Sequence, residues 1–120
     1  MFTEISNVRQ IKGEPKRRWF SDKDLELIVW FGEHDRIVGF QLCYEMDKEP
    51  RALTWRENEG FLHTGIDDGE IGWRAQKATP VLIRDGVFDQ KTIGKRFASS
   101  SQTLPKEIAD FVLLKIKDYP

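Results

Sequence analysis

Two apolar runs separated by a short polar break constrain this chain more than any other feature of its sequence. Residues 25–31 read Leu-Glu-Leu-Ile-Val-Trp-Phe, and residues 37–44 read Ile-Val-Gly-Phe-Gln-Leu-Cys-Tyr. Both runs are rich in the β-branched and aromatic side chains that pack well in a sheet. The intervening Gly-Glu-His-Asp-Arg is typical of a short connection between strands. The pattern therefore predicts an antiparallel hairpin.

The alternation of apolar residues also predicts a register. A four-residue loop in the first hairpin pairs Val29 with Val38, and a second four-residue loop pairs Tyr44 with Leu53. A shift by one residue would set apolar side chains against a poorer match on the partner strand. We expect the apolar face to be the core, and it collects Leu25, Leu27, Val29, Phe31, Val38, Phe40, Leu42, Tyr44, Leu53 and Trp55.

The flanking segments predict further strands. Residues 1–15 resemble an arm or a short edge strand, because a proline ends them. Two more strand candidates lie over 51–56 and 61–64. A two-residue turn between these two would send Leu62 into the core, whereas a three-residue turn would send Phe61 and His63 inward.

The last third of the chain has helical periodicity. A first helix is predicted over 89–98, weakened by Gly94, and a second follows Thr103 as its N-cap. The second helix has one broad apolar face, formed by Leu104, Ile108, Phe111, Val112 and Ile116. Leu113 and Leu114 fall outside that face, which predicts a second contact with the preceding helix or another subunit.

These elements predict an α+β fold: an antiparallel β-meander of about four to six strands with one or two C-terminal helices packed on one face. The 120 residues suit a single domain over 1–120. A formal net charge of −1 gives no global attraction to nucleic acid or acidic lipid. One cysteine and no signal-like or bilayer-spanning apolar run predict a cytoplasmic protein without membrane contact.

The sequence also resembles a known group of proteins. The strings that carry the resemblance are Lys-Arg-Arg-Trp-Phe-Ser-Asp, Leu-Ile-Val-Trp-Phe, Gly-Phe-Gln-Leu-Cys-Tyr and Ala-Leu-Thr-Trp, within residues 12–56. They resemble a family of small single-domain bacterial proteins of unknown function. The resemblance implies a free-standing bacterial domain, and it implies no activity, cofactor or catalytic residue.

The only concentrated positive segment is a candidate binding site. This segment combines cations that could bind phosphates with an aromatic ring on which a base could stack. The cations are Lys16, Arg17 and Arg18, and the ring is that of Trp19. This pattern predicts single-stranded nucleic-acid binding. The alternative is structural, because cations beside an edge strand discourage pairing with other chains.

A second candidate combines His63 with Asp67, Asp68 and Glu70. Nitrogen and oxygen ligands of this kind could hold a divalent cation or orient a general base. Their spacing matches no recognised metal or catalytic motif, so a solvated acidic loop beside a structural histidine is the alternative. Cys43 could act as a nucleophile, but a packing role is favoured because no neighbouring cation is evident. No cofactor is predicted.

The sheet face opposite the core is apolar enough to need cover. In the predicted register it holds Ile28, Trp30, Ile37, Gln41 and Cys43. Either the arm and the region around Trp73 fold over it, or it binds a partner or a second copy. The leading prediction is therefore a non-enzymatic interaction or ligand-binding module that uses this face near Trp30 together with Lys16, Arg17, Arg18 and Trp19.

Overall fold

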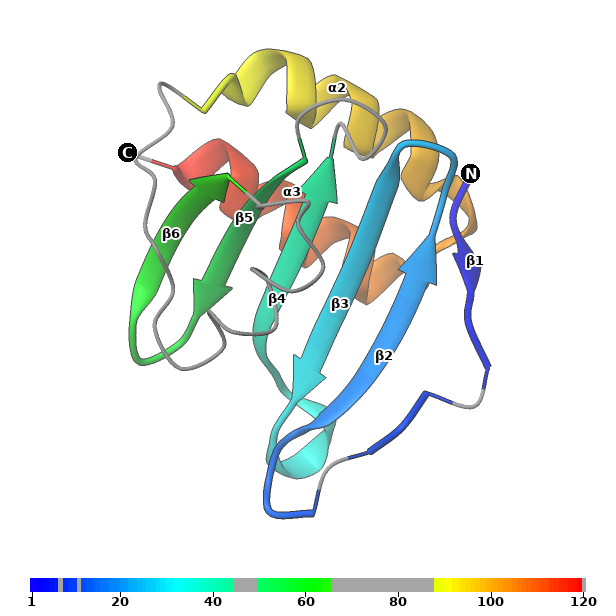
Figure 1. The fold of residues 1–120 in the computed structure, drawn as a ribbon, viewed down its shortest axis with the longest axis vertical. Helices are drawn as coiled ribbons and strands as arrows, with labels where there is room; N and C mark the ends of the chain where they lie inside the picture. Colours follow the sequence, from blue (N-terminus) through cyan, green and yellow to red (C-terminus); the bar gives the residue numbers. More distant parts are fainter. Residues whose placement is uncertain (7, 11, 45–49, 66–87, 120) are drawn as a thin grey trace.

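The structure is a computed structural model. It describes residues 1–6, 8–10, 12–44, 50–65 and 88–119. Within these residues one antiparallel sheet has its strands in sequence order, which confirms the predicted meander (Figure 1). Its strands are β1 (Thr3–Glu4), β2 (Lys16–Ser21), β3 (Leu25–Phe31), β4 (Ile37–Tyr44), β5 (Arg51–Arg56) and β6 (Gly60–Gly65).

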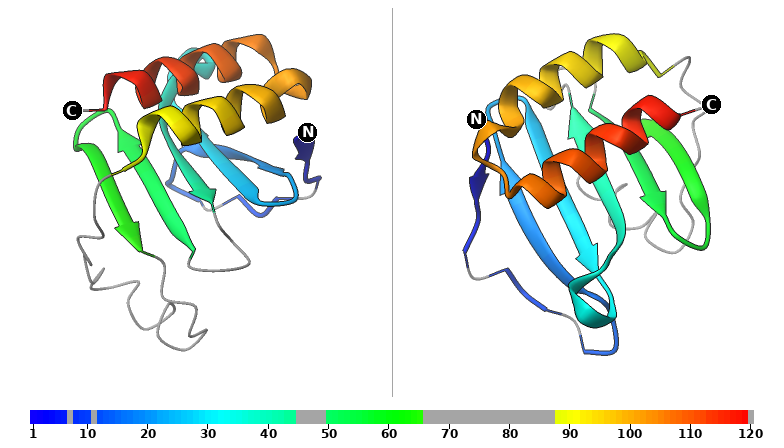
Figure 2. Two further views of the ribbon diagram at one scale, coloured as in Figure 1. Left: turned by 90° about the horizontal axis from the view of Figure 1, so that it is seen from above. Right: turned by 180° about the vertical axis from the view of Figure 1, so that it is seen from behind.

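Two helices follow the sheet in sequence and cover one of its faces. They are α2 (Gln90–Ser100) and α3 (Lys106–Asp118), joined by the short 3-10 helix η2 (Ser101–Thr103). They lie side by side across the sheet (Figure 2). The predicted α+β class, with C-terminal helices packed on one face, is therefore confirmed. Among the described residues, no helix has both the length and the apolar character needed to cross a membrane.

The core lies between the helices and the predicted apolar face of the sheet. That face contributes buried side chains from Leu25, Leu27, Val29, Phe40, Leu42, Tyr44 and Leu53. The helical layer contributes Phe88, Ile93, Phe97, Leu104, Ile108, Val112 and Ile116. Phe31, Trp55 and Phe111 pack against this cluster while half-buried. The N-terminal arm also takes part, because Phe2 is buried against Phe97 with ring centroids 5.8 Å apart.

The predicted register of the first hairpin is wrong by two residues. β3 and β4 pair Val29 with Phe40 rather than with Val38, and Leu27 with Leu42. Side chains on a strand alternate with a period of two, so a two-residue shift leaves the side chains from Phe40 to Tyr44 on their predicted faces. The apolar pattern could therefore identify the core face without identifying the partners across it.

The connection between β3 and β4 explains the shift. The short 3-10 helix η1 (Glu33–Asp35) fills it, and the N–H of Gly32 donates to the carbonyl of Arg36 over 2.7 Å. The register then changes at a bulge next to Phe31, which lies opposite Ile37. Because of this bulge Ile37, which was predicted on the opposite face, packs against the core. Val38, which was predicted on the core face, is not among the residues of that cluster.

The second hairpin is also displaced by two residues. Leu53 of β5 lies opposite Leu42 instead of Tyr44, and Trp55 lies opposite Phe40. The predicted loop between these strands falls mainly on residues 45–49, which lie outside the described residues. The core face is again conserved, because the displacement is even.

The turn between β5 and β6 resolves an alternative that the sequence left open. Arg56 pairs with Gly60, which leaves three residues between them, and Gly60 has a φ of +77° that favours glycine. Phe61 consequently packs against the core, whereas Leu62 is 39% exposed. The three-residue turn is the correct alternative, and it places His63 opposite Leu53 on the core face.

The start of α3 differs from the prediction. The helix begins at Lys106 with Pro105 as its N-cap, whereas Thr103 belongs to η2 and its hydroxyl donates to the carbonyl of Phe2. The residue before a proline is disfavoured in helical geometry, and Leu104 is extended with ψ of 151°. The proline therefore sets the start of the helix. The predicted apolar face of α3 is confirmed, with Ile108, Val112 and Ile116 buried.

Candidate functional site

The predicted binding residues lie on both faces of the sheet. Alternate residues of a strand point to opposite faces. Lys16 and Arg18 therefore share the helix-covered face, while Arg17 and Trp19 share the other face with Trp30. The structure brings together two subsets of the predicted site but not all five residues. Nucleic-acid binding through the basic run as one patch stays a prediction.

The N-terminal arm covers the outer edge of β2. Beyond β1, the N–H of Ile5 donates to the carbonyl of Trp19 over 2.8 Å. Farther along, the side-chain amide of Gln10 accepts from the N–H of Arg17 over 3.0 Å and donates to its carbonyl over 2.9 Å. One glutamine side chain thus replaces the backbone of a missing strand neighbour. It satisfies the backbone N–H and carbonyl of Arg17, which would otherwise be unpaired at the edge of the sheet.

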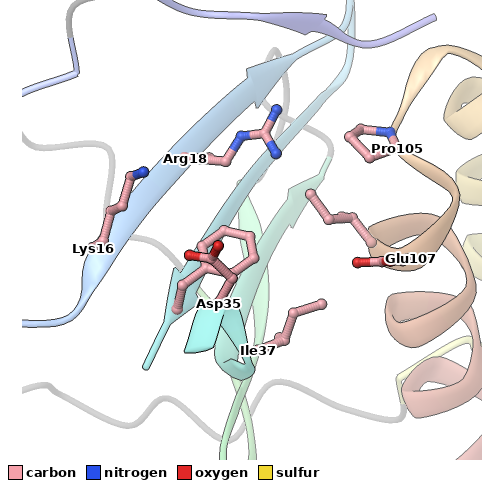
Figure 3. Close-up of a pocket in the computed structure, with 8 residues that line it drawn as sticks. Lys16, Arg18, Asp35, Ile37, Pro105 and Glu107 are labelled. Carbon is pink, nitrogen blue, oxygen red and sulfur yellow. The ribbon is translucent and has the colours of Figure 1, made fainter. Parts of the chain in front are cut away.

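Lys16 and Arg18 line a cleft between the sheet and the start of α3. The cleft has a volume of about 280 Å³, and its wall comprises Lys16, Arg18, Phe31, Asp35, Ile37, Pro105, Glu107 and Ile108 (Figure 3). Phe31, Ile37 and the buried Ile108 form an apolar floor, while the charged side chains form the rim. The volume equals about nine water molecules at ~30 Å³ each. It lies close to the lower end of the ~300–1,000 Å³ range that is typical of small-molecule pockets.

The charged side chains of the cleft differ in whether they form an ion pair within the protein. Arg18 donates two hydrogen bonds to the carboxylate of Glu4, over 2.7 and 2.8 Å. This hydrogen bonding lowers the pKa of Glu4 and raises the pKa of Arg18. In the described part of the chain, Lys16, Asp35 and Glu107 have no ion-pair partner. Lys16 attracts the Glu4 carboxylate only at longer range. One cation and two carboxylates are thus without a direct ion pair.

Two elements position the acidic side of the cleft. Glu107 stands in the first turn of α3, whose N-cap Pro105 provides no side-chain cap. The exposed N–H groups there carry the positive end of the helix dipole. Asp35 and His34 both have left-handed backbone geometry, with φ of 56° and 59°. Such geometry costs about 1 kcal/mol or more per residue, although Asp and His tolerate it better than most residues.

The opposite face holds an aromatic and cationic row. The guanidinium of Arg56 lies 4.3 Å from the centroid of the Trp30 ring. Gly39 lies between them in the sheet, and a Cβ there would come within 2.9 Å of the Trp55 carbonyl oxygen. Arg17 pairs with Trp30 on the other side, so the row continues onto β2. A glycine is thus required where the tryptophan and the arginine meet.

His63 belongs to an aromatic cluster. It hydrogen-bonds the Tyr44 hydroxyl, and the two rings are nearly parallel with centroids 6.0 Å apart. The ring of Phe88 contacts it edge-on at 5.3 Å. The other members of the predicted metal or acid–base site, Asp67, Asp68 and Glu70, lie outside the described residues, as does Trp73. Within the described residues, no cluster of three metal-ligating side chains occurs.

Cys43 is a buried free thiol on the face opposite His63. Burial raises the pKa of this thiol to about 11, which keeps it protonated at neutral pH. Its described surroundings include the amide of Gln41, which lies 3.4 Å from the sulfur. The packing role favoured by the sequence agrees with this environment.

Sequence reasoning missed three residues of the cleft wall, Asp35, Pro105 and Glu107. The sequence pattern places Asp35 in the connection between two strands, and it assigns Pro105 and Glu107 to no site. No local pattern connects Lys16 with Glu107, because about ninety residues separate them in the chain. Only the packing of α3 on the sheet brings them to one site.

No model of a known protein family, no curated protein and no solved structure matches this chain. The family resemblance noted in the sequence therefore stays a prediction.

Proposed function

We propose that this protein is a non-enzymatic ligand-binding module whose cleft takes a small zwitterion of amino-acid size. One observation carries the proposal: unpaired charges of both signs surround an apolar floor in a volume of about 280 Å³. Lys16 would hold the acidic group of the ligand. Asp35 and Glu107 would hold its ammonium group, and Phe31 and Ile37 would contact its apolar side chain.

The mixture of charges favours a zwitterion over a simple anion. Arg18 is already neutralised by Glu4, so the remaining rim carries one positive and two negative side chains. A phosphate or a fatty acid would place its charge beside two unpaired carboxylates, which is unfavourable. Among the described lining residues there is no serine, cysteine, histidine or tyrosine, so none of them offers a hydroxyl, thiol or imidazole nucleophile.

Three probes of nearly equal shape test the proposal. Phenylalanine, phenethylamine and 3-phenylpropionate share an aromatic body and differ in carrying both charges, only the ammonium or only the carboxylate. Backbone amide NMR titrations would follow the residues of the cleft. A hydrogen bond to a charged group contributes about 1.5–3 kcal/mol, so each singly charged probe should bind at least about tenfold more weakly.

Matched variants make the test specific. Lys16→Gln should weaken phenylalanine and phenylpropionate but leave phenethylamine unchanged, and Glu107→Gln should weaken phenylalanine and phenethylamine. Lys12→Gln, an exposed change on the arm, serves as the control and should alter none of the affinities. Equal binding of all three probes, or no shifts in the cleft at millimolar concentration, would refute the proposal.

A second candidate function is single-stranded nucleic-acid binding on the opposite face. The observation that favours it is the row of Arg17, Trp30 and Arg56, in which an indole lies between two guanidinium-bearing residues. Contacts with phosphates predict an affinity that falls steeply as the salt concentration rises. Binding of a labelled oligonucleotide at low and high salt tests it, and Arg17→Gln should reduce the salt slope by about one unit.

The cellular setting belongs to the same proposal. A buried, unpaired thiol at Cys43 is compatible with the reducing cytoplasm that the single cysteine predicts.

A further inference from the structure

The helix pair carries a groove that is separate from the cleft. α2 and α3 run antiparallel, so the start of α2 lies beside the end of α3. There the side-chain amide of Gln90 donates to the carbonyls of Ile116, Lys117 and Tyr119. The groove between them has a volume of about 450 Å³. Gln90 lines it together with Lys91, Gly94, Lys95, Ala98, Leu113 and Lys117.

The groove combines a small-residue floor with a cationic rim. Gly94 and Ala98 lie one turn apart on α2, and their small side chains leave room between the helices. Leu113 supplies apolar surface from α3, which accounts for one of the two leucines that fell outside the predicted core face. Exposed lysines at 91, 95 and 117 surround this surface.

The lysines of the rim are available to a partner. Within the described residues, none of the three lies within 4.0 Å of a carboxylate oxygen. Lys91 and Lys95 stand four residues apart on one helix face, and a like-charge pair at this spacing disfavours the helix. No carboxylate is among the described residues that line the groove. The described lining therefore carries three positive charges and no negative one, although Asp89 at the N-cap of α2 attracts Lys91 from outside the groove.

The shape of the groove distinguishes between kinds of partner. Its lining residues on α2 extend from Gln90 to Ala98, or about 12 Å at 1.5 Å per residue. This length matches two turns of a helix that presents apolar side chains at positions i, i+3 or i+4, and i+7. A flat lipid surface would meet the protruding lysines but would not reach an apolar floor that lies between two helices.

We propose that this groove docks an acidic amphipathic helix of a partner protein. The apolar stripe of the partner lies on Gly94, Ala98 and Leu113, and its flanking glutamates or aspartates pair with Lys91, Lys95 and Lys117. The site is independent of the ligand cleft, because the two share no lining residue.

Fluorescence anisotropy with labelled peptides tests the proposal on the full chain. The probe is an 18-residue helical peptide with leucines at helical spacing and glutamates on both flanks. One comparison peptide carries lysines in place of the glutamates, and another scrambles the acidic sequence so that no apolar stripe remains. Only the acidic amphipathic peptide should bind, and its affinity should fall as the salt concentration rises.

Variants of exposed residues locate the binding site. Lys95→Glu exchanges an attraction for a repulsion and should weaken binding on the order of five- to tenfold. Ala98→Leu fills the groove and should weaken binding at least as much. Ser99→Leu adds the same side chain to the next position of α2, outside the groove, and should leave the affinity unchanged. Circular dichroism verifies that each variant is folded.

Several results would overturn the proposal. Equal binding of the scrambled or the basic peptide would show that the groove does not select an acidic helix. Insensitivity to both Lys95→Glu and Ala98→Leu would place the peptide elsewhere. Co-sedimentation with anionic vesicles that Lys95→Glu abolishes, in the absence of peptide binding, would assign the lysines to a membrane. Dissociation of a dimer by Ala98→Leu would assign the groove to a second copy of the chain.

Discussion

Replacing Gly94 of α2 by alanine should stabilise the protein. Glycine in a helix interior is about 1 kcal/mol less favourable than alanine, because it loses more backbone entropy on folding. The remaining question is whether the structure has room for a methyl group. A Cβ at this position would lie 3.7 Å from Cγ2 of Ile116, which is an ordinary van der Waals distance. The gain in helix propensity should therefore be retained almost in full.

The expected change in melting temperature follows from the size of the chain. Unfolding entropy is about 2.1 cal/mol/K per residue, which gives roughly 0.25 kcal/mol/K for 120 residues. A gain of about 1 kcal/mol should then raise the melting temperature by about 4 °C. Differential scanning calorimetry or circular dichroism measures this shift. An unchanged or lower melting temperature for Gly94→Ala would refute the packing of α2 on α3 described above.

Three further changes test other parts of the fold. Gly39→Ala forces a Cβ to within 2.9 Å of a β5 carbonyl oxygen, so urea denaturation should show a loss of about 1–3 kcal/mol. Hydrogen bonding from Ser100 contributes most to lowering the pKa of Asp22 from 3.8 to about 2. Asp22→Asn should therefore lower the melting temperature at pH 7. The difference in melting temperature between the variant and the original protein should shrink as the pH falls from about 4 through 2. Gln90→Leu removes three hydrogen bonds to the end of α3 and should cost about 1 kcal/mol by the same denaturation assay, whereas Gln102→Leu should have little effect.

The fold class could be predicted because its signals are local. Leu25, Leu27 and Val29 alternate with half-buried positions, and Ile108, Val112 and Ile116 recur at helical spacing. Each period depends only on the geometry of its own element. The same reasoning assigned the helix-covered face of the sheet and the apolar face of α3, both of which the structure confirms.

The pairing between strands was less accessible from the sequence. An even shift of register keeps Val29 and Leu53 on the core face, so hydrophobic alternation cannot detect it. The actual pairing depends on the bulge beside Phe31 and on the five-residue connection that contains η1. Both depend on the length and conformation of the loop, which the pattern of apolar residues does not specify.

For the candidate sites, too, some features follow from the sequence and others only from the tertiary structure. The sequence by itself determined the residues that carry charge, the alternation that places Lys16 and Arg17 on opposite faces, and the two amphipathic helices. Only the tertiary structure decided that Lys16 and Glu107 would line one cleft, that Arg18 would be neutralised by Glu4, and that three lysines would surround a groove. The physical reason is that sequence periodicity fixes the direction of a side chain within its own element. Which other element it meets is settled by the packing of helices on the sheet, where contacts between distant residues offset the entropy of closing the loops that separate them.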